Sequence, residues 1–234
     1  MVRVLAAVPL LALDTLVFGA APLVAGVVDR TGRTCRRLAG TWGRIVLVGL
    51  GVRVEVSGAE NVPGGPAVYA ANHGSALDVP ILFGYLPVDF RIVHKRSLYL
   101  VPVLGWTLWL SGHVGIDRGN AFRARRSLEA AAERVRSGTS VAVFPEGTRS
   151  PDASVRPFKR GSFVLALAAG VPIVPLSLVG VKRVVPRGLL TLRPGTVRVV
   201  IHPPVPTAGR PAEDAAALAE EVRRVVAAGG AEAA

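Results

Sequence analysis

The chain has 234 residues, half of them hydrophobic, and its 28 Lys and Arg against 16 Asp and Glu give a formal net charge of +12. At about 150 residues per domain, this length predicts one large domain with room for an appendage. The apolar content excludes a disordered basic tail, so the charge belongs to a folded protein with an anionic partner, either membrane lipid, a phosphorylated ligand or nucleic acid.

The single cysteine, Cys35, excludes an intramolecular disulfide, and the four histidines are scattered without a zinc-ligand spacing. We therefore expect a reducing compartment, no metal and no cofactor. All but three of the Lys and Arg residues are arginines, whose planar guanidinium suits phosphate better than an ammonium does.

Residues 4–28 form an apolar run with one charge, Asp14. The run is long enough to cross a bilayer, which takes roughly 20 residues. Three interpretations are open: a cleaved signal peptide, a single span, or a membrane-seated helical element broken near residues 19–22. The third avoids placing a carboxylate in hydrocarbon and two prolines within a span.

Residues 34–50 are predicted to form an amphipathic helix, because apolar side chains recur there at helical spacing while Arg30, Arg33, Arg37 and Arg44 project along another side. This pattern favours an interfacial helix with its arginines against lipid head groups. The alternative is a surface helix packed on the core. If the preceding run spans the membrane, the arginines that follow it keep the bulk of the chain on the cytoplasmic side.

We expect residues 1–50 to form a membrane-associated helical motif at the cytoplasmic face of the cell membrane, and residues 51–234 to form the catalytic domain. Beyond Gly51 strands and helices alternate, which is typical of an α/β sheet with helices on its faces. The predicted fold is α/β, with a mixed, largely parallel sheet flanked by helices. Strands are predicted at 52–56, 67–71, 90–94, 113–117, 140–144, 171–178 and 196–202, and helices at 77–85, 103–110, 121–136, 161–169 and 211–228.

The segment Asn72-His73-Gly74-Ser75-Ala-Leu-Asp78 follows a short buried strand. A histidine at a strand end acts as a base when a carboxylate holds its other ring nitrogen, and Asp78 at the start of a helix can curl back to do this. The alternative is a structural histidine capped by a helix-start aspartate.

Two further segments place polar groups beyond strand ends, where active sites of α/β sheets gather. In Phe144-Pro145-Glu146-Gly147-Thr148-Arg149-Ser150, the proline stops the strand and the glycine permits a sharp turn. In Gly115-Ile116-Asp117-Arg118, the arginine is a candidate phosphate ligand, as is Lys95 after another strand. The alternative for each cation is a pairing with a surface carboxylate.

Together, the segments NHGSALD (72–78), GIDR (115–118), FPEGTRS (144–150) and VPIVPLS (171–177) resemble the four blocks of the glycerolipid acyltransferase family, typified by 1-acyl-sn-glycerol-3-phosphate acyltransferases. The resemblance covers most of the chain beyond about residue 50. Gly74 is a departure, since a larger residue is expected at that position.

The resemblance implies transfer of a fatty acyl group from a thioester donor, acyl-CoA or acyl carrier protein, to the free sn-2 hydroxyl of 1-acyl-glycerol-3-phosphate, giving phosphatidic acid. It implies that His73, oriented by Asp78, is the general base. The resemblance further implies acceptor-phosphate ligands at Lys95, Arg118 and Arg149, a pocket shaped by Glu146, Gly147 and Thr148, and a donor site beside Pro172.

Three rival functions remain open. A thioesterase would give the acyl group to water, but it has no need for several cations around a second substrate. A relative that acylates another lysolipid fits the same motifs. A non-enzymatic basic protein that binds a membrane surface fits the charge, whereas nucleic acid does not fit, because the aromatic residues do not interleave with the arginines.

Overall fold

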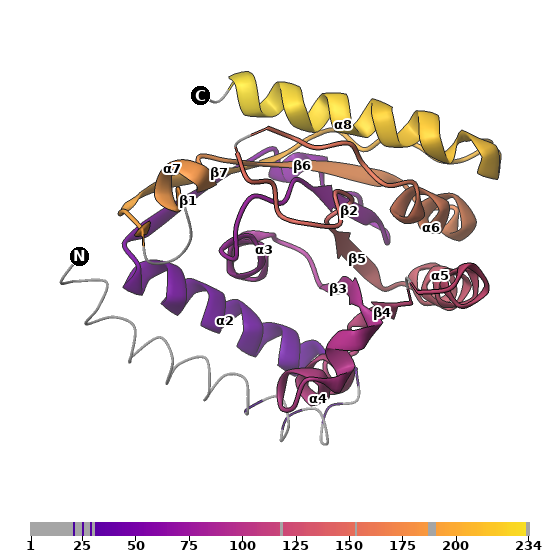
Figure 1. The fold of residues 1–234 in the computed structure, drawn as a ribbon, viewed down its shortest axis with the longest axis horizontal. Coiled ribbons are helices and arrows are strands. Elements are labelled where there is room, and N and C mark those ends of the chain that lie inside the picture. Colours follow the sequence, from indigo (N-terminus) through magenta and orange to yellow (C-terminus); the bar gives the residue numbers. More distant parts are fainter. Residues whose placement is uncertain are drawn as a thin grey trace.

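A computed structural model describes residues 21, 25, 29, 31–117, 119–152, 154–186 and 191–232. Its seven strands form one sheet in the order β1-β7-β6-β2-β5-β3-β4 (Figure 1). Every neighbouring pair is parallel except β6 and β7, which confirms the largely parallel α/β sheet. The strands are β1 (Val52–Ser57), β2 (Val68–Ala71), β3 (Phe90–Lys95), β4 (Val114–Ile116), β5 (Ser140–Val143), β6 (Ile173–Val179) and β7 (Gly195–Ile201).

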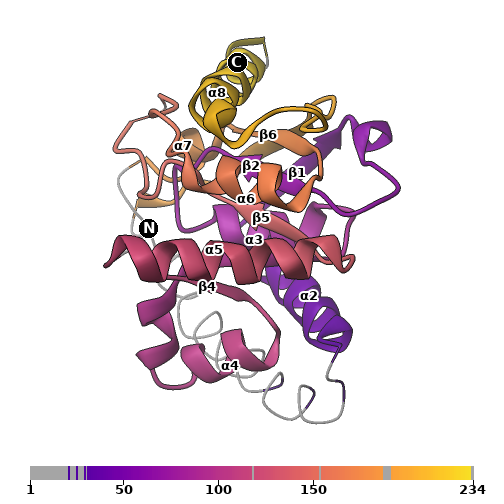
Figure 2. The same cartoon turned by 90° about the vertical axis from the view of Figure 1, so that its right-hand side faces the viewer.

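Helices cover both faces of the sheet (Figures 1 and 2). On β2, Tyr69 and Ala71 face the layer of α2 and α3, whereas Val68 and Ala70 face the layer of α5, α6 and α8. Because both faces are buried, the central strands are continuous apolar runs. The helices are α2 (Arg33–Gly49), α3 (Asp78–Tyr85), α4 (Leu104–Leu110), α5 (Ala121–Arg136), α6 (Gly161–Ala169), α7 (Val181–Val184) and α8 (Ala215–Glu232).

The helix predicted at residues 211–228 differs at its start. Pro211 is extended and is followed by a 3₁₀ turn, Ala212–Asp214, so that α8 begins only at Ala215. The short helix α7 was not predicted, because four residues are too few to show a helical period.

The amphipathic helix predicted at 34–50 is present as α2, and it packs against α3 over a glycine face. A Cβ added at Gly43 would lie 2.4 Å from the carbonyl oxygen of Pro80, so the two backbones approach closely. Arg44, which we expected to face lipid, instead donates from Nε to the carbonyl of Gly84 at 2.8 Å, because that carbonyl at the end of α3 needs a partner. Val46 and Leu47 join the core.

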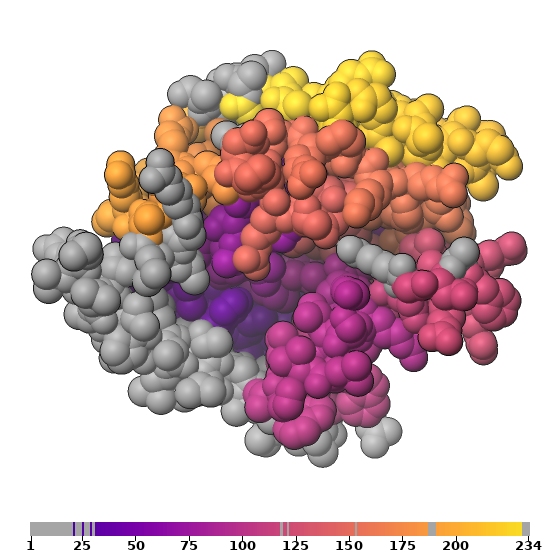
Figure 3. All heavy atoms as spheres, in the orientation of Figure 1, coloured from indigo at the N-terminus to yellow at the C-terminus, as the bar shows by residue number. Residues whose placement is uncertain are grey.

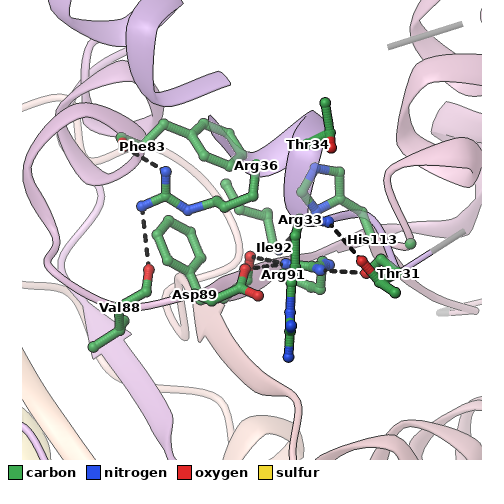
Figure 4. Close-up of polar contacts among 12 residues, drawn as sticks. Thr31, Arg33, Thr34, Arg36, Phe83, Val88, Asp89, Arg91, Ile92 and His113 are labelled. Carbon is green, nitrogen blue, oxygen red and sulfur yellow. Dashed lines mark hydrogen bonds and ion pairs between the residues drawn. The ribbon is translucent and has the colours of Figure 1, made fainter. Parts of the chain in front are cut away.

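The buried side chain of Arg91 links the segment before α2 to β3 (Figure 4). Arg91 donates to Asp89 Oδ1 at 2.5 Å and to the carbonyl oxygen of Thr31 at 2.8 Å. Beside it, His113 Nδ1 accepts from the Ile92 N–H at 3.0 Å, which makes this imidazole a neutral acceptor. Burial, with the neighbouring cations adding to it, lowers the pKa of His113 to about 3.

Among the described residues, none of the helices is both long and apolar enough to span a bilayer. The candidate span at residues 4–28, and Arg30, fall almost entirely outside the part of the chain that the structure describes. The division into a motif at 1–50 and a catalytic domain at 51–234 therefore stays a prediction.

Candidate active site

Five of the strands run in the same direction, so the loops that follow them meet at one edge of the sheet. The segments singled out in the sequence follow β2, β5, β3 and β4. In Figure 1, the loop from β2 to α3 passes next to the salmon loop that follows β5.

His73 and Asp78 are in direct contact. His73 Nδ1 lies 2.7 Å from Asp78 Oδ2, and the same oxygen accepts from the backbone N–H groups of Gly74 and Ser75, each at 2.8 Å. Asp78 is completely buried, whereas the His73 side chain is 16% exposed. The carboxylate therefore fixes the ring and holds the proton on Nδ1, which leaves Nε2 able to accept one.

The FPEGTRS turn holds the His73 loop from the other side. Glu146 is buried, and its Oε1 accepts from the His73 backbone N–H at 2.8 Å, while the N–H of Ser150 donates to the His73 carbonyl at 2.7 Å. The Phe144 ring stacks on the imidazole at 4.2 Å between centroids. Burial raises the pKa of the Glu146 carboxyl, an effect opposed by the hydrogen bond from His73.

Asn72 ties the same loop to β6. Its amide Nδ2 donates to the carbonyl of Leu178 at 3.1 Å, and its Oδ1 accepts from the Leu178 N–H at 2.7 Å. The side chain thus extends the pairing of β2 with β6 by one more residue. Asn72 was not among the predicted site residues, although its position directly before His73 pointed to a place in the site.

The remaining residues of the turn lie next to cationic side chains. Gly147 has a φ of +77°, and a Cβ there would lie 2.8 Å from Lys159 Nζ, so the missing side chain makes room for that ammonium. Thr148 Oγ1 accepts from Arg156 Nη1 at 3.1 Å. Arg149 is exposed. Lys159 and Arg156 are thus further polar neighbours that the turn motif alone did not reveal.

Lys95 lies at the end of β3, opposite Ile116 of β4 in the parallel register. It lines a cavity of about 480 Å³ that also includes Asp117 and Gly119, the described neighbours of residue 118. Arg118 itself lies outside the described residues. Pro172 is at the other edge of the sheet from His73, before the amino end of β6, where its carbonyl accepts from the Val68 N–H at 3.0 Å. This placement gives no support to a role for Pro172 in substrate binding.

A cavity of about 460 Å³ opens at His73. Figure 3 shows this face of the molecule. Violet atoms from the early part of the chain lie deeper there than the salmon segment after β5 and the magenta segment after β3. The wall of this cavity includes Gly74 and Glu146, together with Lys182 and Arg183 of α7. The two α7 cations were not predicted, since nothing in the sequence places residues 182 and 183 beside position 74.

Ser177, which lines the same cavity, contacts His202, and this pair forms a structural link. Ser177 Oγ donates to the Val226 carbonyl at 2.8 Å, so its proton is committed to α8. His202 Nε2 lies 2.8 Å from the same oxygen and must act as the donor there. Ser177 therefore has no base, and the contact fastens α8 to the sheet.

A family model described as Acyltransferase matches residues 53–179. Among curated proteins, the chain is 39% identical over 178 residues to a 1-acyl-sn-glycerol-3-phosphate acyltransferase of Chlamydomonas reinhardtii, covering 75% of this chain and 52% of the relative. It is 38% identical over 156 residues to a chloroplastic relative of that name from Brassica napus, covering 65% and 45%. The human alpha form is 38% identical over 177 residues, covering 74% and 62%. The chain thus spans about half the length of the first two of these relatives.

Among solved structures, the fold matches the crystal structure of the 1-acyl-sn-glycerophosphate acyltransferase PlsC from Thermotoga maritima, with a TM-score of 0.80 and 30% identity. The match covers 99% of this chain and 96% of that one. The stretch matched by the family model contains all four sequence blocks. Since motif order, sequence identity and fold agree, the chain belongs to the acyltransferase family.

Proposed function

We propose that the chain transfers a fatty acyl group from a thioester donor to the sn-2 hydroxyl of 1-acyl-glycerol-3-phosphate, forming phosphatidic acid. The observation that carries this proposal is the 2.7 Å contact between His73 Nδ1 and the buried Asp78 at the mouth of a cavity. No described residue hydrogen-bonds His73 Nε2, which is the atom that must meet the hydroxyl. The names of the relatives support the acceptor.

In the proposed reaction, His73 Nε2 takes the proton of the hydroxyl while the hydroxyl oxygen attacks the thioester carbonyl. The tetrahedral intermediate then collapses, the C–S bond breaks, and the departing thiolate takes the proton back from Nε2. Asp78 stabilises the transient imidazolium. General-base assistance of this kind contributes about 10²–10⁴-fold in rate. Neither an acyl-enzyme nor a metal is part of this scheme.

The acceptor phosphate is proposed to bind to Lys95, Arg118 and Arg149. Lys95 ends β3 and Arg149 follows β5, its parallel neighbour, while Arg118 comes two residues after β4 in the sequence. Neither Lys95 nor Arg149 is paired with a described carboxylate, so both are available to an anion. Gly147 and Thr148 shape this side of the site, and Glu146 positions the His73 loop. Acyl-CoA and acyl carrier protein both present acidic groups to a basic protein.

We further propose that the chain works at the cytoplasmic face of a membrane. The loop after Lys95 and helix α4 expose an apolar surface, here called the α4 patch, with Trp106 57% and Trp109 70% exposed. Exposed tryptophans are typical of the interface between membrane and water. The patch follows Lys95 and Arg96, two exposed cations, so a lysolipid in the bilayer would present its phosphate next to them. Its other members are Leu100, Val101, Val103 and Leu104.

The decisive experiment is an assay of thiol release from acyl-CoA with and without lysophosphatidic acid. We expect release only when the acceptor is present, together with formation of phosphatidic acid. His73→Ala should lower the rate by about 10²–10⁴-fold while the thermal unfolding midpoint stays within a few degrees. Thiol release without the acceptor would indicate a thioesterase, and no release with any lysolipid would indicate a binding protein. A folded His73→Ala variant with a near-normal rate would refute the base assignment.

A further inference from the structure

We infer that Lys182, with Arg183 beside it, forms a second phosphate-binding group at the active site, on the opposite side of β2 from Lys95. The inference rests on the proposed acyl transfer and adds a ligand for one of the phosphorylated substrates. The ligand class is a phosphate ester, supplied either by the head group of the lysolipid or by the phosphates of the donor.

Lys182 packs next to Gly74. The aliphatic chain of Lys182 lies over Gly74, with Cε 3.8 Å and Cγ 3.9 Å from the position that a Cβ at residue 74 would take. Gly74 is adjacent to His73, and both residues line the same cavity as Lys182. The glycine that departs from the family pattern is therefore the residue of the His73 loop that a cation from α7 contacts.

Lys182 is half-buried and has no carboxylate partner among the described residues. By contrast, Arg125 on α5 is paired with Glu129, and Arg210, in the loop before α8, is paired with Glu221. Asp152 also lines the cavity, but its Oδ1 already accepts hydrogen bonds from Ser150 and Ser154. An unpaired ammonium in a cavity favours an anionic ligand, because desolvating it without a partner is costly.

The sheet order separates this group from the proposed acceptor site. Lys182 and Arg183 follow β6, on one side of β2, whereas Lys95 ends β3 on the other side. β6 and β3 lie three strand spacings apart, about 14 Å. The reacting carbonyl and hydroxyl must meet at His73 between the two groups, so each group can serve a different phosphate.

The test measures the KM for acyl-CoA and for lysophosphatidic acid in Lys182→Met, which keeps the length of the side chain and removes its charge. We expect the KM for one substrate to rise about tenfold or more with little change in kcat, since a hydrogen bond to a charged group is lost. A rise for lysophosphatidic acid identifies the head-group phosphate, and a rise for acyl-CoA identifies the donor phosphates. Arg118→Ala provides the reference for a change in the acceptor KM.

Matched controls separate charge from structure. Lys182→Arg should retain both KM values, and Arg125→Met, which removes one exposed cation on α5, should change neither. In the double variant Gly74→Lys/Lys182→Ala, the lysine introduced at residue 74 can place its ammonium in the same part of the cavity. The KM that rises in Lys182→Ala should therefore recover in the double variant. Gly74 accepts a Cβ without a close contact and has no positive φ.

Binding of coenzyme A and of glycerol 3-phosphate, measured by calorimetry, separates this inference from the proposed function. If the wild type transfers acyl groups while Lys182→Met retains both KM values, only the inference is refuted. A fall in kcat alone, without recovery in the Gly74→Lys double variant, also refutes it, since that result indicates a structural role. If the wild type shows no transfer but its binding of either probe weakens in Lys182→Met, the phosphate site stands and the proposed function fails.

Discussion

At the scale of single residues, several hydrogen bonds and a ring contact hold the loop that carries His73. The backbone N–H of His73 donates to Glu146, its carbonyl accepts from Ser150, and its ring is held by Asp78 and stacked on Phe144. Glu146 thus accepts a hydrogen bond from the part-buried backbone N–H of His73. The family resemblance implies that Glu146 shapes the phosphate pocket, whereas its contacts support a positioning role.

Glu146→Ala should therefore be more harmful than Glu146→Gln. The glutamine keeps an oxygen that can accept from the His73 N–H, but alanine leaves this buried donor unpaired at a cost of about 1–3 kcal/mol. We expect a lower free energy of unfolding and a lower kcat for the alanine variant, with values near wild type for glutamine. Denaturant unfolding and steady-state kinetics of both variants would check this. Equal behaviour of the two would argue against the positioning role.

At the scale of elements, α2 and α3 form a unit that sets the position of Asp78 at the amino end of α3. Their close approach depends on Gly43, where a Cβ would lie 2.4 Å from the Pro80 carbonyl and 3.1 Å from the Gly84 nitrogen. Both contacts are with backbone, which cannot rotate away. The interface is completed by Arg36, which donates to the Phe83 carbonyl at 2.8 Å and whose pKa burial lowers to about 10.

Gly43→Ala should destabilise the protein by about 1–3 kcal/mol, as overpacking does in well-packed interiors. Gly161→Ala is the matched control, because a Cβ at this first residue of α6 meets nothing within 4 Å. We expect the control to stay within about 0.5 kcal/mol of wild type. Urea unfolding of the two variants would measure the difference. A Gly43→Ala variant as stable as the control would show that the two helices can separate without cost.

At the scale of the whole molecule, the net charge of +12 is divided among distinct places. Some arginines hold elements together, as Arg36 and Arg91 do, and others pair with glutamates on α5 and α8. Lys182 and Arg183 line the cavity at His73, and Lys95 and Arg96 precede the exposed α4 patch. Figures 1 and 2 place α4 at the end of the molecule opposite α8.

Trp106→Ser/Trp109→Ser should weaken partition to anionic phospholipid vesicles by about tenfold or more, since burying one large apolar side chain contributes about 1.5–3 kcal/mol. Val56→Ser, which replaces an exposed apolar residue on the edge strand β1, should partition like the wild type. Vesicle sedimentation at fixed ionic strength gives the partition coefficients. Unchanged partition of the tryptophan variant would exclude the α4 patch as the membrane contact.

The buried neutral His113 makes stability depend on pH. Its pKa is about 3 in the folded chain against an ordinary 6.5, so between these values the unfolded chain binds a proton that the folded chain does not. The contribution of His113 to the free energy of unfolding is therefore fully present well above pH 6.5 and is lost as the pH decreases. The loss is about 2 kcal/mol between pH 7 and pH 5. Arg91, His94, Arg134 and Arg36 reinforce this direction.

Urea unfolding of wild type and His113→Asn at pH 7 and pH 5 isolates this contribution, because the other titrating groups are common to both chains. The asparagine Oδ1 can still accept from the Ile92 N–H. We expect the loss of unfolding free energy on acidification to be smaller in the variant. An identical loss in both chains would mean that His113 does not remain neutral in the folded state.

The sequence by itself determined what is local: strand and helix periods, the turns, and the order of the four blocks. It placed α5 and α6 at their observed bounds and paired His73 with Asp78, since five residues along one chain are close in any such turn. Only the tertiary structure decided what depends on sheet order. That order brings Lys182 to Gly74, turns Glu146 toward the His73 backbone, and sets Pro172 at the far edge. These contacts join residues distant in sequence, and no periodicity encodes which strands become neighbours.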